Sequence, residues 1–350
     1  MTMTSLHHSR IALARCVLVF FAMLACAPAT AHIWCVSTAA DLRAKLLLAQ
    51  SNGEDDTIKL VRGTYATGSN TFQFLSTETF GLAINGGFDA GCTQSSQDPR
   101  GTILDGGNAV QVFIGEIKGN LALRYLTIQN GKNDDSAGGG FYVHGVGAGS
   151  SVVLGINILR NNSSAYATCV GSIVTEGAVH INGNLIVENH TPAAGGLSVD
   201  AGASSLVYVT NNTIANNTTG SAASGFVYVG GSNTAVPGAY FTNNIMWNNV
   251  AGSDVQFFGT GMQFNNNDIH VIAGFQTAGS GLNVSVDPGF VSSSDYHLAA
   301  TSPLLGTGTF TPPGGLPTVD LEGHARDSNG DVDLGAYERG DEIFADAFEP

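Results

Sequence analysis

The sequence predicts an all-β protein that is mainly one right-handed parallel β-helix of roughly eight to ten coils, with a capping helix at its start. The main observation is a repeat: short apolar segments with alternating polarity recur at steps of 28 residues, as from Ile158 to Ile186 to Ile214. Asparagine and glycine separate these segments, and 46 of the 350 residues are glycine. The segments are too short for helix pairs and rich in Val, Ile and Tyr, which excludes a helical solenoid.

Three columns of apolar side chains are expected to stack inside the coils. They contain Ile158, Ile186, Ile214 and Ile245 in the first, Phe141, Cys169, Leu197 and Phe226 in the second, and Val153, Ile181 and Val209 in the third. Cys169 is therefore expected to be a buried thiol. Because stacked coils lie about 4.8 Å apart, asparagines such as Asn157, Asn184 and Asn212 should hydrogen-bond to their equivalents above and below. An exposed, sugar-binding row of asparagines is the alternative.

The chain begins with an expected export signal over residues 1–31. Its apolar run, residues 17–24, is too short to cross a bilayer, and Ala29-Thr30-Ala31 has the small residues of a signal cleavage site. The pair Ala25-Cys26 leaves lipidation as an alternative route to the cell surface. The mature protein is thus expected to be secreted or held at the cell surface.

Residues 32–56 are expected to form an N-terminal cap. In it, an amphipathic helix over about residues 40–50 would cover the open end of a β-helix that runs from 57 to 286. Export leads to an oxidising compartment, so a disulfide between Cys35 and Cys92 is expected.

The charge balance excludes several partners. The chain has 13 Lys and Arg against 28 Asp and Glu, a net charge of −15, so it should bind neither nucleic acid nor anionic lipid. No Lys or Arg occurs between Arg160 and Arg326. Acidic polysaccharides need cationic partners, so the best-formed repeats should not bind them, and no later segment is apolar enough to span a membrane.

Two blocks resemble known families. The first contains Cys35-Val36-Ser37-Thr38 and Gly86-Gly87-Phe88-Asp89-Ala90-Gly91-Cys92, and it resembles the start of secreted pectate-lyase-like β-helix proteins. The second, residues 287–340, contains Asp295-Tyr296-His297-Leu298 and Asp333-Leu334-Gly335-Ala336-Tyr337-Glu338, and it resembles the choice-of-anchor Q domain. That resemblance implies a surface or secreted β-helix closed by this block, and it implies no reaction. The acidic-aromatic residues 341–350 are interpreted as a solvated tail.

A catalytic centre is hard to find in the sequence. A glycoside hydrolase needs two carboxylates about 5–10 Å apart, and no two acids of the coils are separated by a whole repeat. These acids are Glu176, Glu188, Asp200, Asp254 and Asp268. The adjacent pair Asp134 and Asp135 lies in a loop-like insertion and is the secondary candidate for catalysis or cation binding. His144, Ser172 and Asp200 follow at 28-residue steps, but the serine in the middle would hold His and Asp too far apart for a triad.

Binding residues have two candidate sets. His180, Tyr208 and Tyr240 should form an outward aromatic column that stacks on neutral sugar rings, with cross-strand packing as the alternative. In the closing block, acids gather around Arg326, where an ion pair or a calcium site would suit them. These acids are Asp320, Asp331, Asp333 and Glu338. Calcium is the one cofactor that this pattern suggests.

The sequence as a whole favours a secreted or cell-surface β-helix without catalytic activity, which contacts extracellular glycans, matrix or other cell-surface components. The absence of a repeat-spaced acid pair supports this interpretation. Two alternatives stay open: a carbohydrate-active enzyme, either a glycoside hydrolase or lyase-like, and a purely structural extracellular spacer. The sequence leaves the oligomeric state open.

Overall fold

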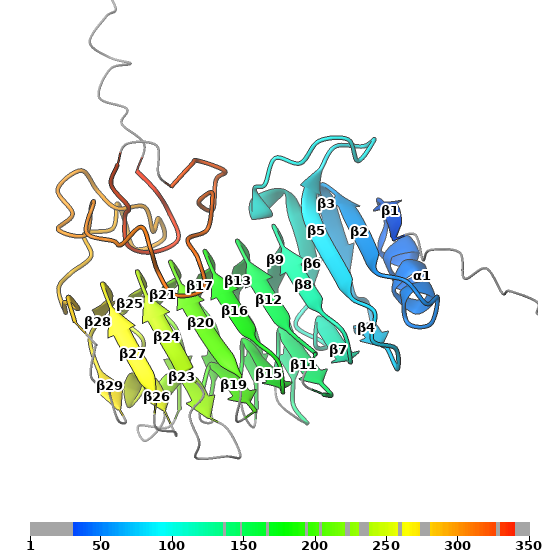
Figure 1. Ribbon diagram of the computed structural model, residues 1–350, viewed down its shortest axis with the longest axis horizontal. Coiled ribbons are helices and arrows are strands. Elements are labelled where there is room, and N and C mark those ends of the chain that lie inside the picture. The colour runs from blue at the N-terminus through cyan, green and yellow to red at the C-terminus, as the bar shows by residue number, and fades with distance from the viewer. Residues whose placement is uncertain are drawn as a thin grey trace, which may run out of the picture.

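The computed structural model describes residues 31–135, 138–147, 149–165, 168–192, 195–202, 205–220, 225–230, 238–257, 261–273, 281–326 and 330–339. The expected export signal, apart from Ala31, and the tail 341–350 lie outside the described residues. The described chain is an all-β, right-handed parallel β-helix of about seven turns, as Figure 1 shows. The fold prediction is confirmed, although the turns are fewer than the eight to ten expected because residues from 287 onward leave the stack.

Each turn of the chain passes through three parallel sheets, here called A, B and C. Sheet A contains β1 (His32–Val36), β2 (Asp56–Val61), β5 (Leu82–Phe88), β8 (Leu121–Arg124), β12 (Val152–Gly155), β16 (Val179–Asn182), β20 (Leu206–Thr210), β24 (Gly238–Thr242) and β27 (Met262–Asn265). Sheet B contains β3 (Gly63–Ala66), β6 (Thr102–Asp105), β9 (Thr127–Gln129), β13 (Ile158–Arg160), β17 (Leu185–Val187), β21 (Thr213–Ala215), β25 (Ile245–Trp247) and β28 (Asp268–Ile269).

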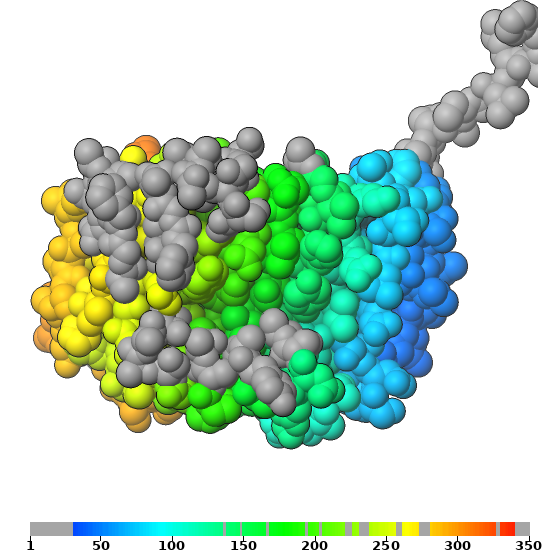
Figure 2. Space-filling model, turned by 90° about the horizontal axis from the view of Figure 1, so that it is seen from below, coloured from blue at the N-terminus to red at the C-terminus, as the bar shows by residue number. Residues whose placement is uncertain are grey.

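Sheet C follows sheet B in each coil. It contains β4 (Phe72–Leu75), β7 (Phe113–Ile117), β11 (Phe141–Gly145), β15 (Gly171–Thr175), β19 (Leu197–Ala201), β23 (Gly225–Gly230), β26 (Ser253–Phe257) and β29 (Ile272–Ala273). A narrow fourth sheet between B and C contains β10 (Lys132–Asn133), β14 (Ser163–Ser164), β18 (His190–Thr191) and β22 (Thr218–Thr219). Figure 2 shows the coils in chain order along the axis, from the blue N-terminal end to the yellow and orange end.

The N-terminal end of the stack is covered as expected. Helix α1 (Ala39–Ala49) begins after Thr38, whose side chain accepts a hydrogen bond from the Asp41 amide at 3.1 Å, a typical N-cap. Leu42 and Leu46 are buried against the first coil, which confirms the predicted capping helix. Cys35 and Cys92 form a disulfide with their Cα atoms 5.7 Å apart. A short 3-10 helix, η1 (Pro99–Gly101), leads into β6.

Two ladders of buried asparagine run along the inside of the stack. The first, at the corner between sheets A and B, consists of Asn157, Asn184, Asn212, Asn244, Asn267 and Asn283. The second, where sheet B ends, consists of Asn162, Asn189, Asn217 and Asn249. From the second rung of each ladder onward, the side-chain carbonyl accepts hydrogen bonds from both the amide side chain and the backbone N–H of the asparagine one coil earlier, as Asn212 does from Asn184. The ladder interpretation of the asparagines is therefore right for the first row.

The residue before each ladder asparagine has a left-handed backbone. At the second corner these residues are Asn161, Glu188, Asn216 and Asn248, with φ between 53° and 58°. Asparagine tolerates this conformation better than most residues. In each repeated Asn-Asn pair, the first residue thus adopts the left-handed turn conformation and the second residue joins the ladder.

The expected apolar columns were partly out of register. Because Asn157 stacks on Asn184, Ile158 pairs with Leu185, and the core column is Leu159, Ile186, Ile214 and Met246. Side chains alternate between faces along a strand, so this one-residue slip turns Ile158 and Ile245 to the outer face of sheet B. Val153 is likewise outward, beside His180, while Leu154 stacks on Ile181.

Unequal coil lengths cause the error in sheet C. Phe141 pairs with Gly171, 30 residues later, and Gly171 pairs with Leu197, 26 residues later. The expected column of Phe141, Cys169, Leu197 and Phe226 is therefore wrong at Cys169 and Phe226. Cys169 lies just before β15 as a fully buried free thiol, and burial raises its pKa to about 12.

The closing block, residues 287–326 and 330–339, covers the outer face of sheet B. In Figure 1 it forms the orange and red loops above β21, β25 and β28. Its apolar side chains Tyr296, Leu321 and Tyr337 form one cluster with Ile158 and Leu185. Left-handed asparagines at the A–B corner hold it: Asn211 Nδ2 donates to the Asp333 carbonyl at 3.1 Å, and Asn243 Nδ2 donates to the Thr309 carbonyl at 2.9 Å. The outward row of sheet B is thus buried instead of facing solvent.

The first prediction tests the ladder. Asn212→Ala should lower the free energy of unfolding by about 1–3 kcal/mol, because it leaves buried groups of Asn184 and Asn244 without partners. Denaturant unfolding followed by circular dichroism measures this loss. The control is Asn248→Gly at an exposed turn, where glycine adopts the same positive φ and the change should stay within about 0.5 kcal/mol. Equal losses in both variants would show that the ladder adds nothing.

The second prediction concerns a buried acid near the C-terminal end of the stack. Asp268 Oδ1 accepts a hydrogen bond from the Val286 amide at 3.0 Å, while Oδ2 has no partner among the described residues. Burial raises the pKa of Asp268 to about 6; the charges of Asp254 and Asp287 add to the rise, and the Val286 bond and His270 oppose it.

A raised pKa in the folded state means that the neutral acid stabilises the fold. Its contribution is complete below the unfolded pKa of about 3.9 and is lost as the pH rises through about 6. Relative to Asp268→Asn, which stays uncharged, the wild-type protein should lose about 1–3 kcal/mol between pH 4 and pH 8. Denaturant midpoints across this range measure the loss. Parallel pH curves for the two proteins would contradict this assignment.

Candidate functional site

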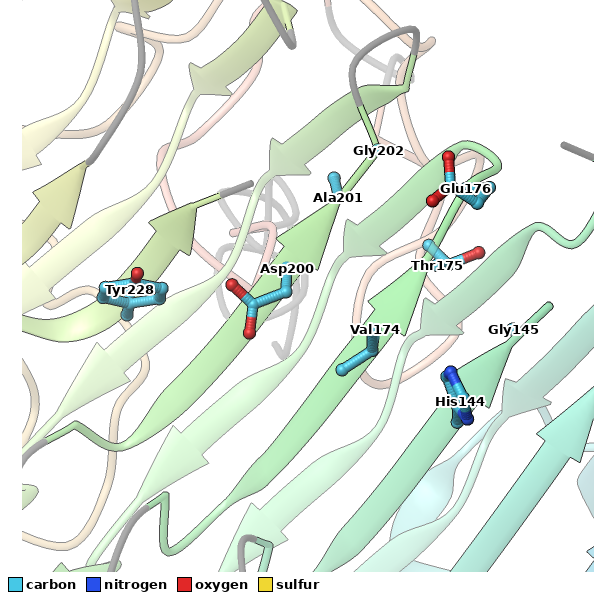
Figure 3. A pocket seen from close by; sticks show the side chains of 9 residues that line it. All are labelled: His144, Gly145, Val174, Thr175, Glu176, Asp200, Ala201, Gly202 and Tyr228. Carbon is cyan, nitrogen blue, oxygen red and sulfur yellow. The ribbon is translucent and has the colours of Figure 1, made fainter. Parts of the chain in front are cut away.

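A pocket of about 440 Å³ lies on the outer face of sheet C, and Figure 3 shows its lining. This sheet C pocket is lined by His144, Gly145, Val174, Thr175, Glu176, Asp200, Ala201, Gly202 and Tyr228. Its side chains come from β11, β15, β19 and β23, which are four successive rungs of the sheet. Strands that stack in register thus build the pocket.

The register decides which side chains meet. His144 pairs with Val174, and Val174 pairs with Asp200, so these three side chains form one outward column. Tyr142, Ser172, Ser198 and Tyr228 form the neighbouring outward column. Ser172 is therefore not in line with His144 and Asp200, and the column of these three residues that the equal steps suggested is wrong.

Glu176 reaches the pocket from the end of β15. Thr175 pairs with Ala201, which places Glu176 beside Gly202. A Cβ atom on Gly202 would lie 2.2 Å from Glu176 Oε2, so the carboxylate occupies the space that a side chain at position 202 would need. Glycine at this position is what allows the Glu176 carboxylate to lie over the strand that carries Asp200.

Asp200 has an unusual environment for a carboxyl group. It is half-buried, makes no hydrogen bond with the described residues, and burial raises its pKa. Burial raises the pKa of Tyr142 and Tyr228 as well; the Glu116 and Asp200 charges add to the rise at Tyr142, and the Asp200 charge adds to it at Tyr228. A carboxyl group that is neither paired nor fully solvated is available to a ligand.

The separation of the two acids of the pocket can be estimated from strand geometry. Glu176 lies over Gly202, which follows the end of β19 and is two residues beyond Asp200. Two residues of a strand span about 7 Å, so the carboxylates should be roughly that far apart. Equal 28-residue steps concealed this pair, because the coil that joins the two residues is shorter than 28 residues.

The loop acids lie elsewhere. Asp134 and Asp135 are exposed after β10, and Asp134 pairs with Lys132 at 2.7 Å. The Asp135 amide donates to Asn133 Oδ1 at 3.1 Å. Neither acid lines the sheet C pocket, and residues 136 and 137 lie outside the described residues.

The aromatic column on sheet A has the predicted register. His180 pairs with Tyr208, and Tyr208 pairs with Tyr240. The ring centroids are 4.7 Å apart in the first pair and 5.6 Å apart in the second. The closing block packs on this column, since a Cβ atom on Gly314 would lie 2.5 Å from the Tyr208 ring. The contacts seen are thus packing contacts, and a ligand role for these rings stays a prediction.

The acids of the closing block surround a fully buried arginine. Arg326 pairs with Glu338 at 3.3 Å and donates to the Ala336 carbonyl at 2.6 Å. Asp320 accepts hydrogen bonds from the amides of Glu322, His324 and Glu338. Asp333 accepts from the amides of Gly306 and Arg339, while Asp331 is exposed.

The carboxylate oxygens of this cluster are thus largely occupied by protein donors. Within the described part of the chain, no group of three or more His, Cys, Asp or Glu side chains could hold a metal ion. The pKa of Glu338 rises to about 8 through burial, and the Arg326 charge opposes that rise. The geometry accounts for Asp320, Asp333 and Glu338 as structural groups, and the calcium site stays an untested prediction.

No model of a known protein family matches the chain, and no curated protein sequence is significantly similar to it. The fold therefore rests on the repeat and the strand topology. Of the helices in the described residues, none is both long and apolar enough to cross a membrane.

Proposed function

We propose that this protein is an exported β-helix that binds a neutral extracellular carbohydrate in the sheet C pocket. The observation that carries the proposal is Asp200: a half-buried carboxyl group that has no hydrogen-bond partner among the described residues and lines the pocket together with Tyr228. Sugar hydroxyls donate hydrogen bonds to carboxylates, and aromatic rings stack on sugar faces. A few polar groups within a concave, partly apolar lining are typical of small-ligand sites.

The charge of the site favours a neutral ligand. The pocket contains Asp200 and Glu176, and no Lys or Arg occurs from residue 161 to residue 325. A polyuronate would meet two carboxylates without a cation to balance it, on a protein of net charge −15. Neutral glycans avoid this repulsion.

Export and surface location support the same proposal. The expected signal at residues 1–31, and the resemblance of residues 287–340 to choice-of-anchor Q domains, favour secretion or display at the cell surface, for adhesion or matrix contact. The Cys35–Cys92 disulfide is compatible with an oxidising compartment.

The third prediction is a binding test with the mature protein on a glycan array. Neutral glycans should bind, and Asp200→Asn should weaken the binding at least tenfold, because the amide no longer accepts at both positions. Asp134→Asn, outside the pocket, should bind like the wild type. Polygalacturonate should not bind at low salt. A wild-type protein that binds no glycan would favour the purely structural spacer.

A second candidate function is hydrolysis of the bound glycan, and the acid pair favours it. A carboxylate separation of about 7 Å lies within the range of inverting glycoside hydrolases, about 6.5–9.5 Å. Asp200, with its raised pKa, would protonate the leaving glycosidic oxygen. Glu176 would take a proton from the water that attacks the anomeric carbon.

The fourth prediction separates hydrolysis from binding. If the pair is catalytic, glycans that bind should release reducing ends, and Glu176→Gln should slow the release by about 10²–10⁴-fold while binding remains. Glu188→Gln, at the corner after β17 and outside the sheet C pocket, is the matched control. Binding without any release of reducing ends would exclude the hydrolase and leave the binding protein.

A further inference from the structure

At the end of the β-helix opposite helix α1, the last segment of the stack bonds to β27 and β28 at two isolated bridges and leaves a backbone edge without a partner among the described residues. We propose that two copies of this protein form a two-fold dimer through this edge, residues 281–286. In Figure 1 the edge lies beyond β27 and β28, at the far end of the stack from α1. The proposal is independent of the glycan site on sheet C.

The hydrogen bonds of the segment define the edge. Gly281 and Val284 bond to the preceding coil, since their amides donate to the Phe264 and Asn267 carbonyls at 2.9 and 2.8 Å. Gly281 bridges to sheet A and Val284 bridges to sheet B, and the described residues next to them make no backbone bond to the preceding coil. Among the described residues the backbone groups of Leu282, Asn283 and Ser285 have no partner, whereas the Val286 amide donates to Asp268 Oδ1 at 3.0 Å. Such a row is a template for another strand.

The first asparagine ladder also ends here, at Asn283, whose backbone amide has no acceptor among the described residues. Asn283 Oδ1 accepts from the Asn267 backbone amide and side chain at 3.1 and 2.9 Å. In the five preceding rungs the backbone amide of the ladder asparagine donates to the next carbonyl, as Asn244 does to Asn267. The Asn283 amide has no such acceptor within the described chain.

Leu282 is a second, independent observation. It occupies the left-handed position of the A–B corner, with φ 57°, where the preceding coils have Asn211, Asn243 and Asn266. Those asparagines bond to the closing block, and the apolar Ile156 at the same position is buried beneath that block. Leu282 does neither and is 81% exposed. Burial by a partner would account for an apolar side chain in this strained position.

A second copy fits this edge best. The N-terminal end is covered by α1, so head-to-tail stacking is blocked, whereas every copy presents the same 281–286 edge. Two identical edges can pair antiparallel about a two-fold axis, which closes the assembly at two copies. The segment Gly281-Leu282-Asn283-Val284-Ser285-Val286 contains no charge and no proline, the devices that usually block edge pairing. The segment itself therefore adds no charge to the contact between two copies.

The fifth prediction tests the dimer by sedimentation velocity over a concentration series of the mature protein. The wild type should change from monomer to dimer and go no further. Leu282→Asn, which places the residue of the earlier coils at this corner, should weaken the dimer at least tenfold without lowering the thermal midpoint. Leu47→Gln is the control, because Leu47 is 67% exposed on α1 at the covered end; it should dimerise like the wild type.

A second variant guards against a local folding effect. Val284→Lys places a charge on the exposed side chain beside the edge and should also give a monomer, with unchanged circular dichroism. A wild-type protein that stays monomeric at the highest soluble concentration would overturn the proposal, because the edge would then bind no second copy. A dimer that both edge variants leave intact, or an open-ended series of larger assemblies, would overturn it as well.

Discussion

The pairing of buried asparagines between coils is the constraint on which the rest of this structure depends. Each ladder asparagine accepts two hydrogen bonds from the coil before it and donates to the coil after it and to a backbone carbonyl, as Asn212 does. These groups have no access to water, and a slip of one residue would leave amides unpaired at a cost of about 1–3 kcal/mol each. The ladders therefore set the register at two corners of every coil in the well-formed part of the stack. The apolar core follows from that register.

The coils differ in length in the connections on either side of sheet C. This variation decides which side chains meet on the outer face of that sheet. The Asn-Asn corners keep sheets A and B aligned, whereas the connections on either side of sheet C differ in length from coil to coil. Those differences bring His144, Val174 and Asp200 into one column and place Glu176 over Gly202. The same stack thus carries a regular scaffold on one side and an irregular, acidic pocket on another, which is the arrangement that a binding face requires.

The closing block explains why the outer faces of sheets A, B and C differ in their accessibility to a ligand. It buries the outer face of sheet B, contacts the aromatic column of sheet A at Tyr208, and holds its own acids around Arg326. Sheet C is the face on which Asp200, without a hydrogen-bond partner among the described residues, lines a pocket. The ends differ in the same way, because α1 covers one end and the 281–286 edge forms the other. Glycan contact through sheet C and self-association through the edge would use separate surfaces, so a dimer could present two pockets at once.

The sequence by itself determined the parallel β-helix, the capping helix and the role of asparagine at the corners. These features depend on local patterns: alternation along a strand, a capped amphipathic helix, and turn residues that repeat. The aromatic register of His180, Tyr208 and Tyr240 could also be found, because each of them stands directly before an inward apolar residue of its sheet A strand.

Only the tertiary structure decided the core column of sheet B, the burial of Ile158 beneath the closing block, and the meeting of Glu176 with Asp200. Each depends on the exact pairing of one coil with the next. Aligning the coils by isoleucine instead of by asparagine shifts the expected pairing in sheet B by one residue. Because side chains alternate between the two faces of a strand, a shift of one residue exchanges inward and outward positions. Equal steps hid the acid pair, because the lengths of loops around sheet C leave no periodic signal in the sequence. The asparagine ladders, which satisfy buried amides only in one register, choose between pairings that apolar periodicity alone leaves equivalent.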